Sequence, residues 1–329
     1  VIQVLVTSGS LSSLFTGLLV PICTYIILAI SLNLVVGFLG ELSLGHAGFM
    51  CIGAFTSAFF SKCMKGVIEP DLLRFMIALL IGAVCAGIFG ILIGIPVLRL
   101  NGDYLAIVTL AFGEIIKNVI NVFYIGKDSK GFHFSMKDSV SLNMEPDGKI
   151  LLNGPQGISG TPKDSTFTIG FILILITLVI VLNLISSRTG RAIMAIRDNR
   201  IAAESVGINI TKYKLMAFTI SAAMAGAAGV LYAHNLSTLT ANTNNFGYNM
   251  SIMILVFVVL GGIGNIRGSI IAAVILTLLP EMLRGLSDYR MLIYAIVLIV
   301  MMLFNWAPKA IEWREKYLSF GKKKKEAVK

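Results

Sequence analysis

The segment Phe167–Ser186, FTIGFILILITLVIVLNLIS, holds twenty residues and no charged side chain. A helix needs about 20 mainly apolar residues to cross the hydrocarbon core of a bilayer. Strands of a membrane β-barrel would be shorter and would alternate in polarity, whereas this run is continuous. The pattern predicts an all-α, polytopic transmembrane helical bundle of about nine spans. The eight further apolar runs are 14–36, 46–61, 73–96, 104–124, 213–233, 249–264, 267–284 and 289–306.

The composition of the 329-residue chain agrees with a lipid environment. Hydrophobic residues make up 56% of it, charged residues make up 13%, and the mean hydropathy is +0.86. Soluble domains are roughly 45–50% apolar and about 25% charged. These values exclude a disordered chain, a secreted disulfide scaffold and an ordinary soluble enzyme. The four cysteines form no CxxC pattern and have no histidine at metal spacing, so we expect neither a metal site nor a cofactor.

The basic residues predict the orientation in the membrane, because cytoplasmic loops carry an excess of Lys and Arg. Two segments are strongly basic: 187–214, with six Lys and Arg, and the tail 309–329, with eight. Aromatic residues are not interleaved with them, so nucleic-acid binding is not expected. Four predicted spans separate the two segments, which places both in the cytoplasm and the start of the chain outside.

The chain then divides into a transmembrane domain, 1–308, and a basic cytoplasmic tail, 309–329. The segment 126–165 becomes an external loop, because its Gly, Pro, Asn and Ser clusters are typical of loops. An external partner could dock on it, or it could be a solvated connector.

A glycine-rich stretch, 37–49 (GFLGELSLGHAGF), separates two apolar runs. Backbone that is unpaired at membrane depth must be buried in protein or line a cavity. Broken helices of this kind, in which helix N-termini point at anionic groups, build transport sites. Glu41, Ser43 and His46 are therefore candidate pathway residues. The alternative is a short cytoplasmic turn whose structural glycines serve packing, and these glycines are Gly37, Gly40 and Gly45.

A second glycine-rich stretch, 261–268 (GGIGNIRG), also lies on the predicted cytoplasmic side. Gly261, Gly262 and Gly264 are its candidate structural glycines. Its sequence is weakly similar to that of the first stretch. The similarity could reflect an internal repeat, as found in transporters, or it could be chance similarity between two glycine turns. Neither stretch is a phosphate-binding loop, because no strand precedes a GxGxxG pattern and GxxxxGK[ST] does not occur.

An ionisable residue, Glu114, falls near the middle of the predicted span 104–124. Lys117, Asn118 and Asn121 follow at helical spacing and share its face. Ionisable groups inside a span are costly and usually face the bundle interior or water, where they are functional. We predict Glu114 and Asn118 as pathway residues, and a purely structural pair between Glu114 and Lys117 is the alternative.

The cytoplasmic segment of about 187–212 contains a predicted short amphipathic helix. Ile193, Ile196 and Ala203 fall on one face, and Arg200 and Glu204 are neighbours at i,i+4 spacing. The helix stops at Gly207. Such a helix could lie on the bilayer surface or fit a groove on a cytoplasmic partner. We favour the partner, because the apolar face is narrow and holds no bulky Trp, Phe or Leu.

Five motifs occur in the order found in one family: GELSLGHAGF (40–49), GDYLAIVTLAFGEI (102–115), GPQGI (154–158), the stretch 190–207 and GGIGN (261–265). With them the chain resembles the branched-chain amino acid ABC transporter permeases of the LivM type. The resemblance implies a non-catalytic subunit of the bacterial cytoplasmic membrane. It implies a second homologous permease, two cytoplasmic ATPases and an external binding protein that delivers Leu, Ile or Val. It also implies that 190–207 meets an ATPase. The helical pattern of this stretch makes Ile193, Ile196, Arg200, Ala203, Glu204 and Gly207 the candidate coupling residues.

Other functions remain open at this point. Related permeases for sugars, nucleosides, or urea and amides are alternatives within the same fold. A proton-coupled carrier or an intramembrane enzyme, with Glu114 and His46 as proton-transfer groups, is the alternative of another class. No HExxH, paired carboxylates or Ser-His spacing supports an enzyme.

Overall fold

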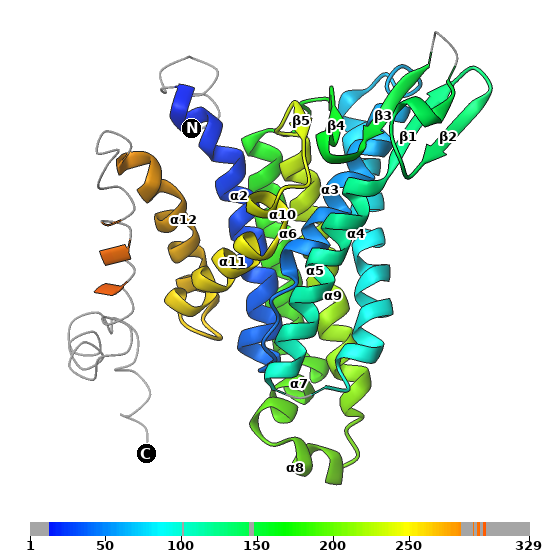
Figure 1. The fold of residues 1–329 in the computed structure, drawn as a ribbon. Coiled ribbons are helices and arrows are strands. Elements are labelled where there is room, and N and C mark those ends of the chain that lie inside the picture. Colours follow the sequence, from blue (N-terminus) through cyan, green and yellow to red (C-terminus); the bar gives the residue numbers. More distant parts are fainter. Residues whose placement is uncertain are drawn as a thin grey trace, which may run out of the picture.

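The computed structural model describes residues 13–100, 102–144 and 148–283, together with residues 292, 295, 296, 299 and 300. Within these ranges the chain is mostly helical (Figure 1). Its helices are α2 (Ser13–Asn33), the π-helix η1 (Leu34–Leu39), α3 (His46–Cys63), α4 (Asp71–Val97), α5 (Asp103–Val122), the 3-10 helices η2 (Val140–Leu142) and η3 (Gly154–Gln156), α6 (Phe167–Ser186), α7 (Arg188–Asp198), α8 (Arg200–Ser205), α9 (Ile210–Ala233), α10 (Thr243–Phe246), α11 (Tyr248–Gly261) and α12 (Ile266–Met282).

Six stretches of helix in the described part of the chain are long and apolar enough to cross a membrane. The predicted runs 46–61 and 267–284 correspond to α3, which ends next to the charged Lys62, and to α12, which has only 17 residues. Most of the run 289–306 lies outside the described residues. A helical membrane protein is confirmed, and the total of nine spans stays a prediction. The six stretches are Thr16–Leu39, Asp71–Val97, Tyr104–Val122, Phe167–Ser186, Ile210–Ala233 and Thr243–Gly261.

Short polar side chains fix the starts of several helices. The side-chain oxygens of Thr166, Ser187, Asn199, Asn209 and Asn265 each accept a hydrogen bond from the backbone N–H three residues later, at 3.0–3.4 Å. Such caps satisfy N–H groups that have no partner within the helix. The turns between apolar runs are therefore specified by local sequence.

The core of the bundle forms around α9, which packs against α2, α3 and α4. Small residues allow close contact: a Cβ on Gly53 of α3 would lie 2.2 Å from the carbonyl oxygen of Gly226 in α9. Small residues are common where membrane helices approach each other closely. Most of α9 and α2 is buried within the chain, whereas α4, α5 and α6 turn broad apolar faces outward.

The segment predicted as an external loop contains a small sheet, so a purely helical fold was wrong in this part. Strands β1 (Tyr124–Asp128), β2 (Gly131–Ser135) and β3 (Lys149–Asn153) are antiparallel in the order β2-β1-β3. The Asp128 carboxylate accepts the N–H groups of Lys130 and Gly131 and closes the turn between β1 and β2. A two-residue strand, β4 (Ile158–Ser159), pairs with β5 (Thr238–Leu239).

The sheet and the helices α7 and α8 lie at opposite ends of the long helices (Figure 1). The bundle therefore has one end made largely of strands and another made of short, polar helices.

Candidate functional site

Two helices begin inside the bundle instead of at its ends. α3 begins at His46, whose Nε2 lies 2.7 Å from Ser31 Oγ within α2. α11 begins at Tyr248, whose backbone N–H donates to Glu114 Oε1 within α5 at 2.8 Å. The two starts are joined, because Ala47 N–H donates to Ser251 Oγ of α11 at 3.2 Å. The chain thus has two broken-helix segments that meet beside α5.

Glu114 and Lys117 form an ion pair where α5 passes the start of α11. The Lys117 side chain is 9% exposed and the Glu114 side chain 24%. Lys117 Nζ also donates to Thr243 Oγ1 of α10 at 3.0 Å. Glu114 therefore links the cation on its own helix to the backbone at the start of α11, where a carboxylate stabilises the helix dipole.

Asn118 follows Glu114 by four residues in α5, but its side chain is exposed. It lies among apolar neighbours on the outer face of the helix, where Ile115, Val119 and Val122 surround it. The structure therefore separates Asn118 from the buried ion pair, while Asn121 donates to the carbonyl oxygen of Ala241 at 3.0 Å.

The segment between η1 and α3 has no regular secondary structure and contacts α5. Leu44 N–H donates to Thr109 Oγ1 at 3.0 Å, and a Cβ on Gly45 would lie 2.2 Å from the Thr109 carbonyl oxygen. Glycine at position 45 is therefore required by the close backbone contact. Ser43 is buried, and its hydroxyl has no hydrogen-bond partner among the described residues.

Glu41 forms an ion pair with Lys214 of α9. Only 13% of the Glu41 side chain and 5% of the Lys214 side chain are exposed. Removing one member of such a pair leaves an uncompensated buried charge. The sequence identified Glu41 but not Lys214, which lies 173 residues further along the chain.

The two glycine-rich stretches contact each other. A Cβ on Gly37 would lie 2.4 Å from the backbone nitrogen of Gly264. Asn33 joins the two stretches, because its Oδ1 accepts the Gly264 N–H and its Nδ2 donates to Ser269 Oγ, both at 2.9 Å. Gly262 and Gly264 have φ of +93° and +80°, and a Cβ on Gly261 would lie 2.3 Å from the nitrogen of Ser269.

The segment 187–212, predicted to be cytoplasmic, differs from the single amphipathic helix expected. It folds as α7 and α8, which are separated at Asn199. Ile193, Ile196 and Ala203 are buried against the rest of the chain, so they do not offer a free docking face. The physical reason is that periodicity reveals an apolar face but not what covers it.

The exposed part of this segment is instead α8 and the turn after it. Arg200, Glu204 and Gly207 are exposed there, and Gly207 ends the segment with φ of +84°. Ile201 and Val206 are 80% and 74% exposed. A pair of apolar side chains directed away from the chain was missed, because neither belongs to the predicted face.

Arg197 connects α7 to the first glycine-rich stretch. Its Nη1 donates to the carbonyl oxygen of Gly37 at 3.0 Å, and a Cβ on Gly40 would lie 2.6 Å from its Cγ. Gly40 has φ of +77°. Helix α7 is therefore attached directly to the break after α2.

The comparisons with known proteins agree with this architecture. Residues 14–304 match the family described as the branched-chain amino acid transport system / permease component. The chain is 35% identical over 296 residues to the high-affinity branched-chain amino acid transport system permease proteins LivM of Salmonella typhimurium and Escherichia coli. Each alignment covers 87% of this chain and 67% of the relative.

A more distant relative is the fructose import permease protein FruG of Bifidobacterium longum. It is 26% identical over 250 residues, which cover 74% of this chain and 69% of the relative. No solved structure gives a significant match.

The family match covers most of the described helices and includes both broken-helix segments. Its members are non-catalytic, multi-pass membrane subunits of bacterial ABC transporters. The chain belongs to the permease family of branched-chain amino acid ABC transport systems.

Proposed function

We propose that this chain is the permease subunit of an ATP-driven importer that carries Leu, Ile or Val across the bacterial cytoplasmic membrane. The observation that carries this proposal is the 35% identity to two LivM proteins over 87% of the chain. A second homologous permease completes the pathway, two cytoplasmic ATPases supply the free energy, and an external protein delivers the substrate. The weaker similarity to FruG makes a sugar the alternative substrate.

The proposed topology places the sheet outside and α7, α8 and the basic tail in the cytoplasm. Two facts support it: the sheet and the short helices lie at opposite ends, and 187–214 is rich in Lys and Arg. The nine-span arrangement, with the start of the chain outside, then follows from the apolar runs.

The pathway is proposed to pass the two broken-helix segments. Glu41, Ser43, His46, Glu114 and Asn118 are its candidate residues. Glu41 and Glu114 are already paired with lysines, so they act on the substrate through the position of the helix starts. Helix N-termini suit the carboxylate of a zwitterionic amino acid. The apolar outer face of α5, interrupted by Asn118, would contribute the wall that faces the second permease.

Coupling to ATP hydrolysis is proposed to run through α8, α7 and Arg197. Ile201 and Val206 provide the exposed apolar contact for an ATPase, and Arg200, Glu204 and Gly207 border it. Ile193, Ile196 and Ala203 transmit the motion, since they fasten the segment to the bundle. The bond from Arg197 to Gly37 would carry a displacement of α7 to the contact between Gly37 and Gly264.

Uptake of labelled leucine tests this proposal. The chain and the neighbouring transporter genes are expressed in cells that lack their own branched-chain uptake, with and without this chain. ATP-dependent accumulation of leucine is expected only when the chain is present. Labelled fructose and urea serve as controls, and uptake of either in place of leucine would reject the substrate assignment.

A further inference from the structure

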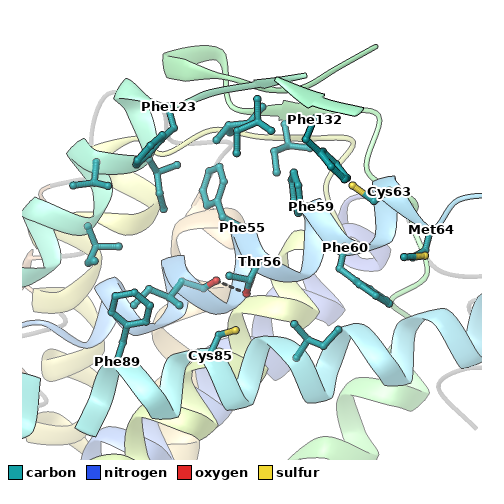
Figure 2. Close-up of a pocket in the computed structure, with 18 residues that line it drawn as sticks. Phe55, Thr56, Phe59, Phe60, Cys63, Met64, Cys85, Phe89, Phe123 and Phe132 are labelled. Atoms are coloured by element: carbon teal, nitrogen blue, oxygen red, sulfur yellow. Dashed lines mark hydrogen bonds between the residues drawn. The ribbon is translucent and has the colours of Figure 1, made fainter. Parts of the chain in front are cut away.

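An apolar groove of about 570 Å³ lies between α3, α4 and α5, under the small sheet. Seven residues between Ile52 and Met64, on α3 and directly after it, form one wall, and Ile81, Cys85 and Phe89 of α4 form another. Figure 2 shows the strands above the groove, with Phe132 directed down into it. Six phenylalanines line the groove: Phe55, Phe59, Phe60, Phe89, Phe123 and Phe132.

The groove offers almost no polar group to a ligand. Thr56 carries the one hydroxyl among the lining residues, and it donates to the carbonyl oxygen of Ile52 in its own helix at 2.7 Å. Cys63 and Cys85 behave as small apolar residues. A zwitterionic amino acid would find no partner for its ammonium or carboxylate group here, so the groove does not suit the transported substrate.

A second, polar pocket of about 270 Å³ adjoins the groove at Cys63, which lines both. We call it the lysine pocket, because Lys62, Lys65, Lys127 and Lys149 line it, with Asp128. Four ammonium groups and one carboxylate give it a net positive charge.

The lysines are arranged so that three of them reach solvent. Lys62 Nζ is held by the carbonyl oxygens of Ile150 and Leu151, at 2.7 and 3.1 Å. Lys65, Lys127 and Lys149 are exposed, and the Lys127 ammonium lies 5.5 Å from the ring centroid of Phe132 in the groove.

Asp128 is the one carboxylate among the residues that line the lysine pocket. Asp128 Oδ2 lies 2.9 Å from His133 Nε2, and Oδ1 accepts the N–H groups of Lys130 and Gly131. One carboxylate can balance only one of the four ammonium groups, so the lysine pocket keeps a net positive charge.

We propose that the groove and the lysine pocket together bind one anionic phospholipid. An acyl chain lies along the phenylalanines, and the phosphate of the headgroup contacts Lys65, Lys127 and Lys149. The distribution of charge supports this assignment. An apolar groove meets a cationic pocket at Cys63, at the end of the bundle where the long apolar helices stop. Clustered basic residues next to a bilayer attract anionic headgroups. By the proposed topology this pocket faces the outer leaflet, so the lipid would come from that leaflet.

A helix of a second permease is a less suitable occupant. A helix with its side chains is about 10–12 Å wide, so a space of this size would admit only about one turn. The lipid would hold α5 in position from the side, since Ile116 and Ile120 of that helix line the groove and Glu114 lies on the same helix.

Native mass spectrometry of the assembled transporter tests the headgroup. Phosphatidylglycerol and phosphatidylcholine with identical acyl chains are titrated separately. The wild type should bind phosphatidylglycerol about tenfold more tightly or better. The triple variant Lys65→Gln, Lys127→Gln, Lys149→Gln should lose this preference. The matched triple variant Lys130→Gln, Lys137→Gln, Lys163→Gln alters exposed lysines outside the pocket and should keep it. Equal binding of both lipids by the wild type, or equal loss in both triple variants, would overturn the proposal.

A second arm tests the groove and the source of the phosphate. Cys85→Phe fills the groove and should weaken both lipids, whereas Cys85→Ser, of nearly unchanged volume, should not. Inorganic phosphate at the same concentration should leave bound phosphatidylglycerol in place. Displacement by phosphate would show a free-anion site instead, and a disulfide from Cys85 to an introduced cysteine in another subunit would show a protein interface. Either result rejects the lipid site.

Discussion

Replacing Glu114 with Gln separates the two roles open to the Glu114–Lys117 pair. Gln has nearly the same volume and keeps an oxygen that can accept the N–H of Tyr248, but it cannot ionise. Lys117 would then retain only the Thr243 hydroxyl as a partner. Removing one member of a buried ion pair costs about 3–5 kcal/mol. Because Glu114 is one quarter exposed, the pair is partly solvated, and we expect a loss of about 2 kcal/mol in stability.

The assay combines thermal unfolding of the purified complex with ATP-driven leucine uptake. Glu114→Gln should lower the melting temperature by on the order of 5 °C while the protein still assembles in the membrane. Uptake should fall by more than the fraction of protein lost, because the start of α11 is no longer held by a charged group.

The double variant Glu114→Gln, Lys117→Met supplies the control. It removes the uncompensated charge and should recover much of the stability. If the pair positions the pathway, uptake stays impaired in the double variant. Normal uptake by Glu114→Gln at normal abundance, or full recovery in the double variant, would refute the reasoning and leave the pair a structural one.

Three further predictions address packing, docking and topology. Gly37→Ala should destabilise the protein by about 1–3 kcal/mol, because the added Cβ would collide with Asn33 and Gly264. Gly17→Ala is the control, because a Cβ on Gly17 would have no atom within 4 Å. Equal melting temperatures of the two variants would contradict the contact. Ile201→Asp should abolish co-purification of the ATPase, because loss of a docking hot spot costs about 2 kcal/mol or more of binding free energy. Membrane insertion should stay normal, and retained co-purification would exclude α8 from the interface. In a background without native cysteines, a cysteine at Ser135 should react with an impermeant thiol reagent in intact cells and one at Asn199 should not; the reverse result would invert the topology.

The parts of the fold that the sequence predicted are those set by local patterns. The run Phe167–Ser186 is α6, and the helices are broken within 37–49 and 261–268. Both breaks could be predicted because glycine and polar residues visibly interrupt the apolar runs of the sequence. The sheet was missed because its strands are only five residues long and contain glycine and charged residues. Short segments of this kind cannot be distinguished from loops without their partner strands.

The sequence predicted several residues of the candidate site but not the distant residues that contact them. Glu41, His46 and Glu114 stand out as polar groups within apolar surroundings. Lys214, the partner of Glu41, does not, because the two residues are 173 positions apart in the sequence. Asn33 was missed for the same reason, since its partner Gly264 is 231 residues away. Arg197 was counted as a topology signal, and nothing in its neighbourhood indicated a bond to the Gly37 carbonyl.

The central position of α9 also has a consequence for synthesis. Residues 71–97 of α4 leave the ribosome well before α9 is complete at Ala233, 136 residues later. At about 5–20 residues per second, this interval lasts roughly 7–27 s. Ser61 lacks its hydrogen-bond partner His234, at 2.8 Å, throughout that time. Arg74 is paired with Asp71 on its own helix and meets Asp164 earlier, after 90 further residues. The nascent chain must therefore keep Ser61 near the membrane surface or shielded by the insertion machinery until α9 is complete.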